Sequence, residues 1–293
     1  MDRVIPFAER DLLRLLPKVL RARDFHLYLE GGKRPSRRLM DLWLQGGRAV
    51  LGHKPPNVVN ELKNAAERGL FTSLPHPMER RFIKALEVFF PGRVFRLYGN
   101  EDSLCRALTE SDEWDETNRA NPTEAMPFPD PAFPMDNAPG KLSLWRPFLE
   151  PPPEIDNTPV LIPVLPWPLG PAVLVLEKDF AASFPDGELI APVLLAPAAR
   201  AIHNLAAAQK AFAENHPRFL KIENALKNSP WRRRGIYLTV NPDMEKEKYK
   251  ELFLRFLDGG CLIPPSPREP AILPRTMSAG EEAKLAELLG LGC

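Results

Sequence analysis

Residues 41–86, DLWLQGGRAVLGHKPPNVVNELKNAAERGLFTSLPHPMERRFIKAL, carry the strongest structural signals in the chain. After the Gly-rich turn GGRAVLGH, Pro55-Pro56 opens a predicted helix over residues 57–68, because proline suits the first turn of a helix. Gly69 ends that helix, and apolar spacing predicts another helix over residues 78–89. The stretch therefore predicts a glycine turn followed by two helices.

On both sides of this stretch, short apolar segments alternate with helical patterns. Before it, two apolar stretches flank GGKRPSRR and predict a hairpin, and an amphipathic pattern predicts a helix over residues 7–20. After it, the strand Val94–Tyr98 enters the turn Gly99-Asn100-Glu101-Asp102 and a helix. The other predicted elements are strands at residues 160–165, 172–177, 231–240 and 261–263 and helices at 189–215, 245–257 and 278–289. This alternation predicts an α/β protein with a mainly parallel sheet and a smaller C-terminal α/β part.

The composition is that of a folded, nearly neutral chain that is rich in proline. The 293 residues include 39 Lys and Arg against 38 Asp and Glu, and 44% are hydrophobic. These values argue against a disordered chain and give no reason to expect nucleic acid or an anionic membrane as a partner. The 34 prolines exclude an all-helical bundle for at least part of the chain, because proline inside a helix costs about 3 kcal/mol.

Cysteine usage and the apolar stretches suggest the setting of the protein. Cys105, Cys261 and Cys293 form no CxxC pair, so neither a metal site nor a disulfide framework is indicated. Residues 158–177 are the least charged apolar stretch, but five prolines interrupt it, and we expect no membrane span. We expect a reduced, cytoplasmic protein.

Proline and acidic residues are concentrated in the middle of the chain. Residues 101–136 hold ten acidic and two basic side chains, and residues 121–171 hold 15 prolines. Such a stretch is typical of a linker, a wrapping arm or a long ordered loop, and the sequence leaves these alternatives open.

The turn Gly99-Asn100-Glu101-Asp102 has the form of an anion site. A helix N-terminus presents free N–H groups and the positive end of the helix dipole. Glu101 and Asp102 place two carboxylates there, which repel an anion but suit the first turn of a helix. We therefore favour a plain helix start at this turn.

The 41–86 stretch resembles the N-terminal region of class III aminotransferases, fold-type I pyridoxal-phosphate enzymes that include glutamate-1-semialdehyde aminomutase. In that family a Gly-rich turn with a Leu-Gly-His-x-x-Pro signature precedes a helix that ends in Arg-Gly. The matching residues here are Gly46, Gly47, Leu51, Gly52, His53, Pro56, Arg68, Gly69 and Glu79. The segment VFRLYGNEDSLCRAL resembles the family's phosphate cup, and residues 249–289 resemble its small domain. Together the two ends cover about half of the chain.

This resemblance implies a truncated three-layer large domain of the pyridoxal-phosphate transferase type and a smaller α/β domain. The smaller domain would be formed by the C-terminal part and the N-terminal arm. We place the arm and hairpin at residues 1–45, the large domain at 46–205 with a Pro-rich insert at 121–171, and the small domain at 206–293. The resemblance also implies a homodimer with its sites at the subunit interface.

The residues with which the family uses its cofactor are missing. Setting Ala172 on the family's alanine puts Ile162 at or near the position of the Schiff-base lysine, and no lysine lies between Lys141 and Lys178. The ring-stacking aromatic-His-Gly and the Asp-Glu-Val that pairs with the pyridine nitrogen are absent from the shortened region. An isoleucine cannot form an imine.

The phosphate cup is vestigial under the same resemblance. Its residues would be Gly99, Asn100, Glu101 and Asp102, and this turn has gained Asp102 and lost the family's hydroxyl. We therefore expect no bound cofactor. If the protein does bind one, we expect it to be pyridoxal phosphate.

These observations predict a degenerate homologue without transaminase activity that acts as a dimeric binding or regulatory protein. One alternative is a pyridoxal-phosphate aminotransferase or aminomutase with a displaced lysine, Lys178 first and Lys141 next. Another is a phosphometabolite- or nucleotide-binding module, because arginines beside an aromatic residue hold phosphate and stack. The residues for that module are Trp231, Arg232, Arg233 and Arg234.

Overall fold

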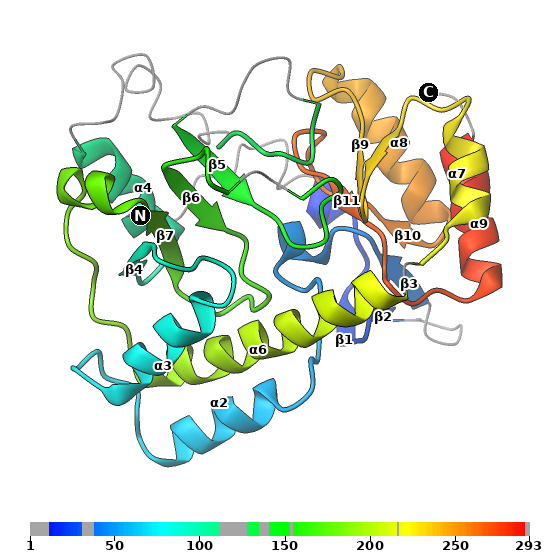
Figure 1. Cartoon of the computed structure of the whole chain (residues 1–293). Helices are drawn as coiled ribbons and strands as arrows, with labels where there is room; N and C mark the ends of the chain where they lie inside the picture. Colours follow the sequence, from blue (N-terminus) through cyan, green and yellow to red (C-terminus); the bar gives the residue numbers. More distant parts are fainter. Residues whose placement is uncertain are drawn as a thin grey trace. The chain divides into compact units, whose positions relative to one another are not determined.

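The computed structural model describes residues 12–30, 38–111, 128–134, 141–152, 155–215 and 217–290 (Figure 1). The chain forms two compact units. Unit 1 consists mainly of Pro55–Pro147 and Pro153–Gln209, and unit 2 of Ile5–Lys54, Phe148–Pro152 and Lys210–Cys293. The sequence-based domain bounds at residues 45 and 205 stay a prediction, and each unit is described by itself.

Unit 1 is built on a four-stranded sheet with the strand order β4-β7-β6-β5. The strands are β4 (Val94–Tyr98), β5 (Leu142–Trp145), β6 (Val160–Pro163) and β7 (Ala172–Leu176). Every residue of β6 and β7 is buried, as is typical of interior strands with both faces covered. The sheet therefore forms the middle layer of this unit.

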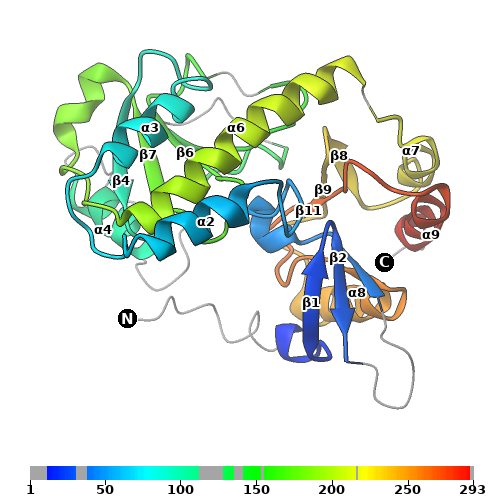
Figure 2. The ribbon, with the colours of Figure 1, turned by 90° about the horizontal axis from the view of Figure 1, so that it is seen from below.

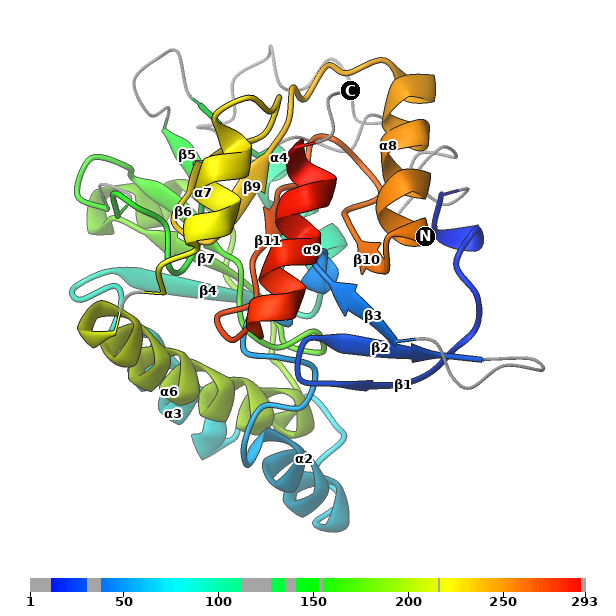
Figure 3. The ribbon, with the colours of Figure 1, turned by 90° about the vertical axis from the view of Figure 1, so that its right-hand side faces the viewer.

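Helices cover both faces of this sheet. On one face, α4 (Glu101–Glu110) and the short 3-10 helix η2 (Lys178–Ser183) contribute Leu104, Leu108 and Ala181 to a core shared with alternate residues of the strands. On the other side lie α2 (Val58–Glu67), α3 (Pro77–Leu86) and α6 (Pro192–Glu214), as Figures 1 and 3 show. Unit 1 thus has three layers.

The described residues of unit 2 form two small sheets. The first has the order β1-β2-β3-β10, made of β1 (Val19–Arg23), β2 (His26–Leu29), β3 (Arg38–Asp41) and β10 (Cys261–Leu262). The second has the order β11-β9-β8, made of β8 (Arg232–Arg234), β9 (Tyr237–Thr239) and β11 (Ala271–Ile272). A backbone bond from Ile272 N–H to the carbonyl of Leu42 links β11 to the loop after β3.

The larger helices described in unit 2 are α7 (Leu220–Leu226), α8 (Lys246–Asp258) and α9 (Ala279–Gly290), and the short 3-10 turn η1 (Leu44–Gly47) lies in the same unit. The helix α8 packs on β10, and Figure 2 shows it behind the β1–β2 hairpin. The helices α7 and α9 lie side by side. N- and C-terminal segments therefore share one fold unit, as expected.

Several predicted elements are confirmed within a few residues. The β2–β3 pair is the predicted antiparallel hairpin, although its turn, residues 31–37, lies outside the described residues. The predicted helix over residues 278–289 begins with a capping box, since the Ser278 hydroxyl accepts from the Glu281 backbone N–H at 3.3 Å and the Glu281 carboxylate accepts from Ser278 N–H at 3.0 Å. Local capping signals therefore located helix ends well.

The expectation of a mainly parallel sheet is wrong. β7 runs antiparallel to both of its neighbours, and in unit 1 the described parallel pair is β5 with β6. Residues 164–171 join β6 to β7 and contain three prolines and one glycine. A short connection of this kind joins antiparallel strands, because a parallel pair needs a longer crossover.

Three further expectations need correction. The predicted helix over residues 7–20 is helical at residues 12–14 and then becomes β1 after Pro17, while residues 7–11 lie outside the described part. The predicted single strand at 231–240 is a hairpin that turns at Gly235, whose φ is +59°. The strand β5 was not predicted, because its four residues lie within the Pro-rich stretch.

None of the described helices combines the length and the apolar character that crossing a bilayer requires.

Candidate functional site

Side chains of the turn between β4 and α4 cap the start of α4. Asn100 has an extended backbone and its side-chain oxygen accepts from Ser103 N–H at 2.8 Å, which caps α4. Glu101 and Asp102 occupy the first turn of α4, where the helix dipole favours negative charge. The preferred interpretation of this turn as a helix start agrees with the geometry.

A carboxylate from elsewhere in unit 1 reaches the same turn. Glu188 Oε2 accepts from Gly99 N–H at 2.7 Å, and Glu188 N–H donates to the carbonyl of Leu97 at 2.7 Å. Tyr98 lies on the same strand end, and burial raises its pKa to about 12, although the positive charge of Arg96 opposes this rise. Sequence reasoning missed Glu188, which no motif marks.

Ile162, at the expected position of the Schiff-base lysine, is a core residue. It lies in β6, pairs with Leu144 of β5 and is 8% exposed. It belongs to the same buried cluster as Leu104 and Leu108 of α4. The side chain thus contributes to packing beneath α4.

The two lysines that bracket this position lie elsewhere. Lys178 is exposed and begins η2, just after β7. Lys141 is exposed and precedes β5.

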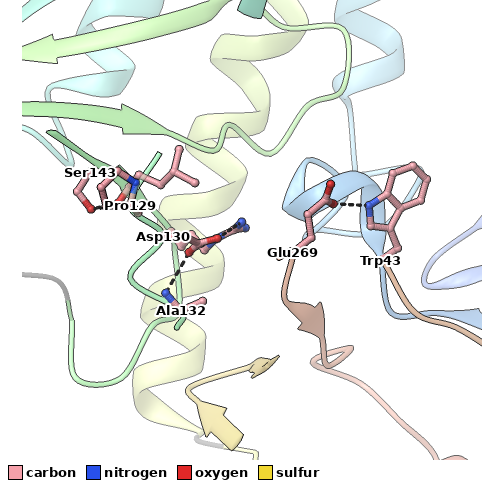
Figure 4. Close-up of polar contacts among 8 residues, drawn as sticks. Trp43, Pro129, Asp130, Ala132, Ser143 and Glu269 are labelled. Atoms are coloured by element: carbon pink, nitrogen blue, oxygen red, sulfur yellow. Dashed lines mark hydrogen bonds and ion pairs between the residues drawn. The ribbon is translucent and has the colours of Figure 1, made fainter. Parts of the chain in front are cut away.

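The end of β5 carries a buried ion pair that the sequence did not reveal. The guanidinium of Arg146 contacts both carboxylate oxygens of Asp130, at 2.6 Å from Nη2 and 2.8 Å from Nε, and the two side chains are 4% and 9% exposed. Asp130 also accepts from Ala132 N–H, as Figure 4 shows. Leu144 N–H and the Ser143 hydroxyl both donate to the carbonyl of Pro129, so this part of the Pro-rich stretch is bound along β5.

The glycine-rich segment of unit 2, residues 43–53, is organised by Asp41. This buried carboxylate accepts from the N–H groups of Trp43 and Leu44 at 2.9 Å and lies 3.0 Å from His53 Nε2. Leu44 and Gln45, neither of them glycine, have φ angles of +47° and +52° in the left-handed region. Asp41 and His53 therefore hold a strained turn in place.

Two other contacts in unit 2 fix the surroundings of this turn. Trp43 Nε1–H donates to Glu269 Oε2 at 2.8 Å (Figure 4). At Gly52, with φ +88°, an added Cβ would lie 3.0 Å from the carbonyl oxygen of Asp24, so glycine is required. The motif residues Gly52 and His53 thus have structural roles.

The predicted phosphate-binding group at Trp231 is divided among different contacts. Trp231 is 3% exposed and packs on Phe256 of α8 at 5.5 Å. Arg233 pairs with Glu223, donates to the carbonyl of Gly235 and lies over the ring of Phe219. Arg232 is exposed.

Pyridoxal phosphate, the cofactor that the resemblance implies, requires an amine for an imine and an anion site for its phosphate. At the positions that the resemblance marks, Ile162 supplies no amine, and the N–H of Gly99 is already bound to a carboxylate. The side chains at these positions do not fit this cofactor. The described residues also hold no group of three His, Cys, Asp or Glu side chains that is arranged to bind a metal ion.

Sequence comparison finds relatives in spirochaetes. No model of a known protein family matches the chain. An uncharacterized protein of Treponema pallidum (strain Nichols) is 26% identical over 91% of this chain and 92% of its own length. An uncharacterized protein of Borreliella burgdorferi is 37% identical over 102 residues, 33% of this chain and 36% of its own length.

Solved structures with a similar fold are aminotransferases. Plasmodium falciparum ornithine δ-aminotransferase has a TM-score of 0.63 at 12% identity, covering 96% of this chain and 97% of that one. An ω-transaminase from Sphaerobacter thermophilus has a TM-score of 0.58 at 10% identity, covering 97% and 95%. Acetylornithine aminotransferase from Elizabethkingia anophelis has a TM-score of 0.57 at 12% identity, covering 93% and 92%.

At these identities the likeness concerns the fold, and it does not distinguish one aminotransferase subfamily from another. The fold class expected from the sequence is confirmed. The chain has the aminotransferase fold, the fold-type I architecture of the pyridoxal-phosphate enzymes.

Proposed function

We propose that the protein is a degenerate aminotransferase homologue that does not catalyse transamination and that works as a binding or regulatory protein. The observation that carries this proposal is the buried isoleucine at position 162 of β6. Under this proposal the protein binds no cofactor and is located in the cytoplasm. Its relatives would be the class III aminotransferases, in particular the members similar to glutamate-1-semialdehyde aminomutase.

The chemical argument is that transamination begins with an amine at a defined place. A Schiff base needs an unprotonated lysine amine within reach of the cofactor aldehyde. Ile162 has no such group, and its side chain fills a core position under α4, where Leu104 and Leu108 pack. Placing a lysine there would bury an ammonium group among apolar side chains, which is costly.

The alternative with a displaced lysine has no supporting observation in unit 1. Lys178 and Lys141 are both exposed, whereas a reactive lysine is typically desolvated or placed beside another cation. The nucleotide-binding alternative is similarly weak, since Trp231 and Arg233 are engaged in packing and an ion pair.

A homodimer is part of the proposal, because class III aminotransferases are dimers. Two large apolar side chains in the loop between α2 and α3, Phe71 and Leu74, are 62% and 60% exposed. Exposed apolar groups close together in a loop are compatible with a covered surface. Light scattering of the purified chain tests this part: a mass of one chain at micromolar concentration would contradict it.

The central test is a covalent one. The full chain is mixed with pyridoxal phosphate, reduced with borohydride and mapped by peptide mass spectrometry, beside a K141M/K178M variant. We expect no stoichiometric pyridoxyl-lysine and no aldimine absorption band that hydroxylamine removes. A single lysine labelled to one equivalent in the wild-type chain would refute the proposal, and loss of that label in the variant would favour the displaced lysine.

A further inference from the structure

The segment from Pro185 to Glu188, here called the strap, runs along the outer edge of β4, which is an end strand of the unit 1 sheet. Glu188 N–H donates to the carbonyl of Leu97, and the Tyr98 hydroxyl donates to the carbonyl of Pro185 at 3.3 Å. Arg96 Nη2 lies 3.2 Å from Asp186 Oδ1. The strap is thus attached to three consecutive residues of β4.

Gly187 allows the strap to come this close. A Cβ at this position would lie 2.7 Å from the backbone nitrogen of Leu97 and 2.9 Å from its carbonyl oxygen. Real Cβ atoms do not approach backbone atoms so closely, so a side chain here would push the strap away from β4. The close approach of the two backbones therefore depends on a glycine.

The strap ends with its carboxylate on the turn before α4. Glu188 Oε2 accepts from Gly99 N–H at 2.7 Å, and the next capping position is filled by Asn100, which accepts from Ser103 N–H. Backbone N–H groups at the start of a helix are general binding groups for phosphate and other anions. In this chain, the Ser103 N–H in the first turn of α4 is bound to Asn100, and the Gly99 N–H just before the N-cap is bound to Glu188.

We infer that the strap is a built-in plug, in which the Glu188 carboxylate occupies the place of an anion and closes the β4–α4 turn to phosphate groups. The dianion of a phosphate ester has to displace Glu188 from Gly99 and enter beside the carboxylates of Glu101 and Asp102. This inference goes beyond the missing lysine, because a phosphate group can bind to backbone N–H groups without any imine.

Inorganic phosphate is the probe that tests the plug, since it has no aldehyde and cannot label a lysine. Phosphate is titrated into the full chain at constant ionic strength, and binding is followed by the midpoint of thermal unfolding. The variants are E188A, which removes the carboxylate, and E188Q, which keeps the shape and removes the charge. D186A is the matched control, because Asp186 lies in the strap but pairs with Arg96 rather than with the turn.

We expect the wild-type chain and D186A to bind phosphate weakly and with equal affinity. E188A and E188Q are expected to bind phosphate about fivefold more tightly than the wild type, which is the effect of removing one neighbouring negative charge. Phosphate binding by the wild type equal to that of E188A, or an equal gain in D186A, would overturn the plug. Failure of E188A and E188Q to gain affinity would overturn it as well, and it would leave the borohydride test of the missing lysine unaffected.

Discussion

Two glycine-containing turns, one in each unit, each place a carboxylate on backbone N–H groups. In unit 2, Asp41 is 2% exposed, accepts from Trp43 and Leu44 and contacts His53. In unit 1, Glu188 is exposed and holds the single N–H of Gly99. Both turns therefore bind a carboxylate through backbone N–H groups, but the carboxylate is buried in unit 2 and exposed in unit 1.

Because of this difference in burial, we expect Asp41 to stabilise the fold and Glu188 to block the β4–α4 turn at the surface. Removing a buried acceptor leaves its donors unsatisfied in a low dielectric, which costs about 1–3 kcal/mol for each group. Removing an exposed acceptor lets water take its place. We therefore expect stability to depend on Asp41 and anion access to depend on Glu188.

A third carboxylate, Asp130, tests whether the contribution of a carboxylate to stability depends on its burial or on the unit in which it lies. It lies in unit 1 like Glu188 but is 9% exposed and is paired with Arg146. R146A leaves the Asp130 charge without its guanidinium partner, and we expect a loss of about 3–5 kcal/mol in the free energy of unfolding. Urea denaturation measures it, with R96A as the control, because the Arg96–Asp186 pair of the strap is partly exposed, with side chains 26% and 92% exposed. A loss below about 1 kcal/mol would break the comparison.

Substituting Asp41 tests the buried turn itself. D41A removes the acceptor of two backbone N–H groups and the partner of His53, and we expect a loss of about 3 kcal/mol in unfolding free energy. D41N retains a carbonyl oxygen for the N–H groups and should lose less. Denaturation curves of the two variants should separate; equal midpoints would show that the carboxylate charge and its bonds matter little here.

G187A tests the exposed β4–α4 turn by disturbing the strap that carries Glu188. The added Cβ has to move away from the backbone of Leu97, and overpacking of this kind costs about 1–3 kcal/mol. Because the strap lies at the sheet edge, we expect a value at the low end. Hydrogen exchange should speed up at the amides of Gly99 and Glu188, while an unchanged exchange rate at both would contradict the close contact. G92A, at a glycine with no atom within 4 Å of an added Cβ, is the control for the chemistry of the change, although its φ of +74° adds strain of its own.

Glu281 is an intermediate case and gives the smallest effect, which depends on pH. Burial raises the pKa of this carboxyl group, but hydrogen bonds from the Ser278 backbone and hydroxyl and from His26 outweigh it, so the pKa lies below its ordinary value. A lowered pKa stabilises the fold above the unfolded-state value of about 4.3, and this contribution is lost as the pH falls through the folded-state pKa.

The wild type and E281Q should therefore differ most at neutral pH and converge in acid below about pH 4. We expect a difference of less than about 1 kcal/mol, because Arg38, one of the partners of Glu281, is largely exposed. Unfolding free energies measured from pH 7 downward check this, and a difference that grows on acidification would contradict the sign.

Local signals in the sequence were reliable where a residue acts on its own neighbours. The proline pair before α2 and the Ser278–Glu281 capping box mark helix starts, because helix-start signals involve residues only a few positions apart. The direction of β7 was predicted wrongly, since the apolar run of a buried strand is the same in parallel and antiparallel sheets. β5 was missed because prolines surround it.

The candidate site also contains one feature that the sequence reveals and one that it does not. The absence of an amine at residue 162 can be read from the sequence, because the amino acid at a position is a covalent fact and folding cannot supply an amine there. The burial of Ile162 beneath α4 agrees with its apolar character. Glu188 could not have been found, because 89 residues separate it from Gly99 and neither residue lies in a motif that includes the other.

By itself, the sequence determined most of the helices, most of the strands, the α/β class and the absence of an amine at residue 162. These depend on periodicity, caps and residue identity, which act over a few positions. The tertiary structure alone decided the antiparallel insertion of β7, the Asp130–Arg146 pair and the closure of the β4–α4 turn by the strap. Each of these joins segments that are distant in the chain, and their pairing is set by the packing of the whole unit rather than by local preference.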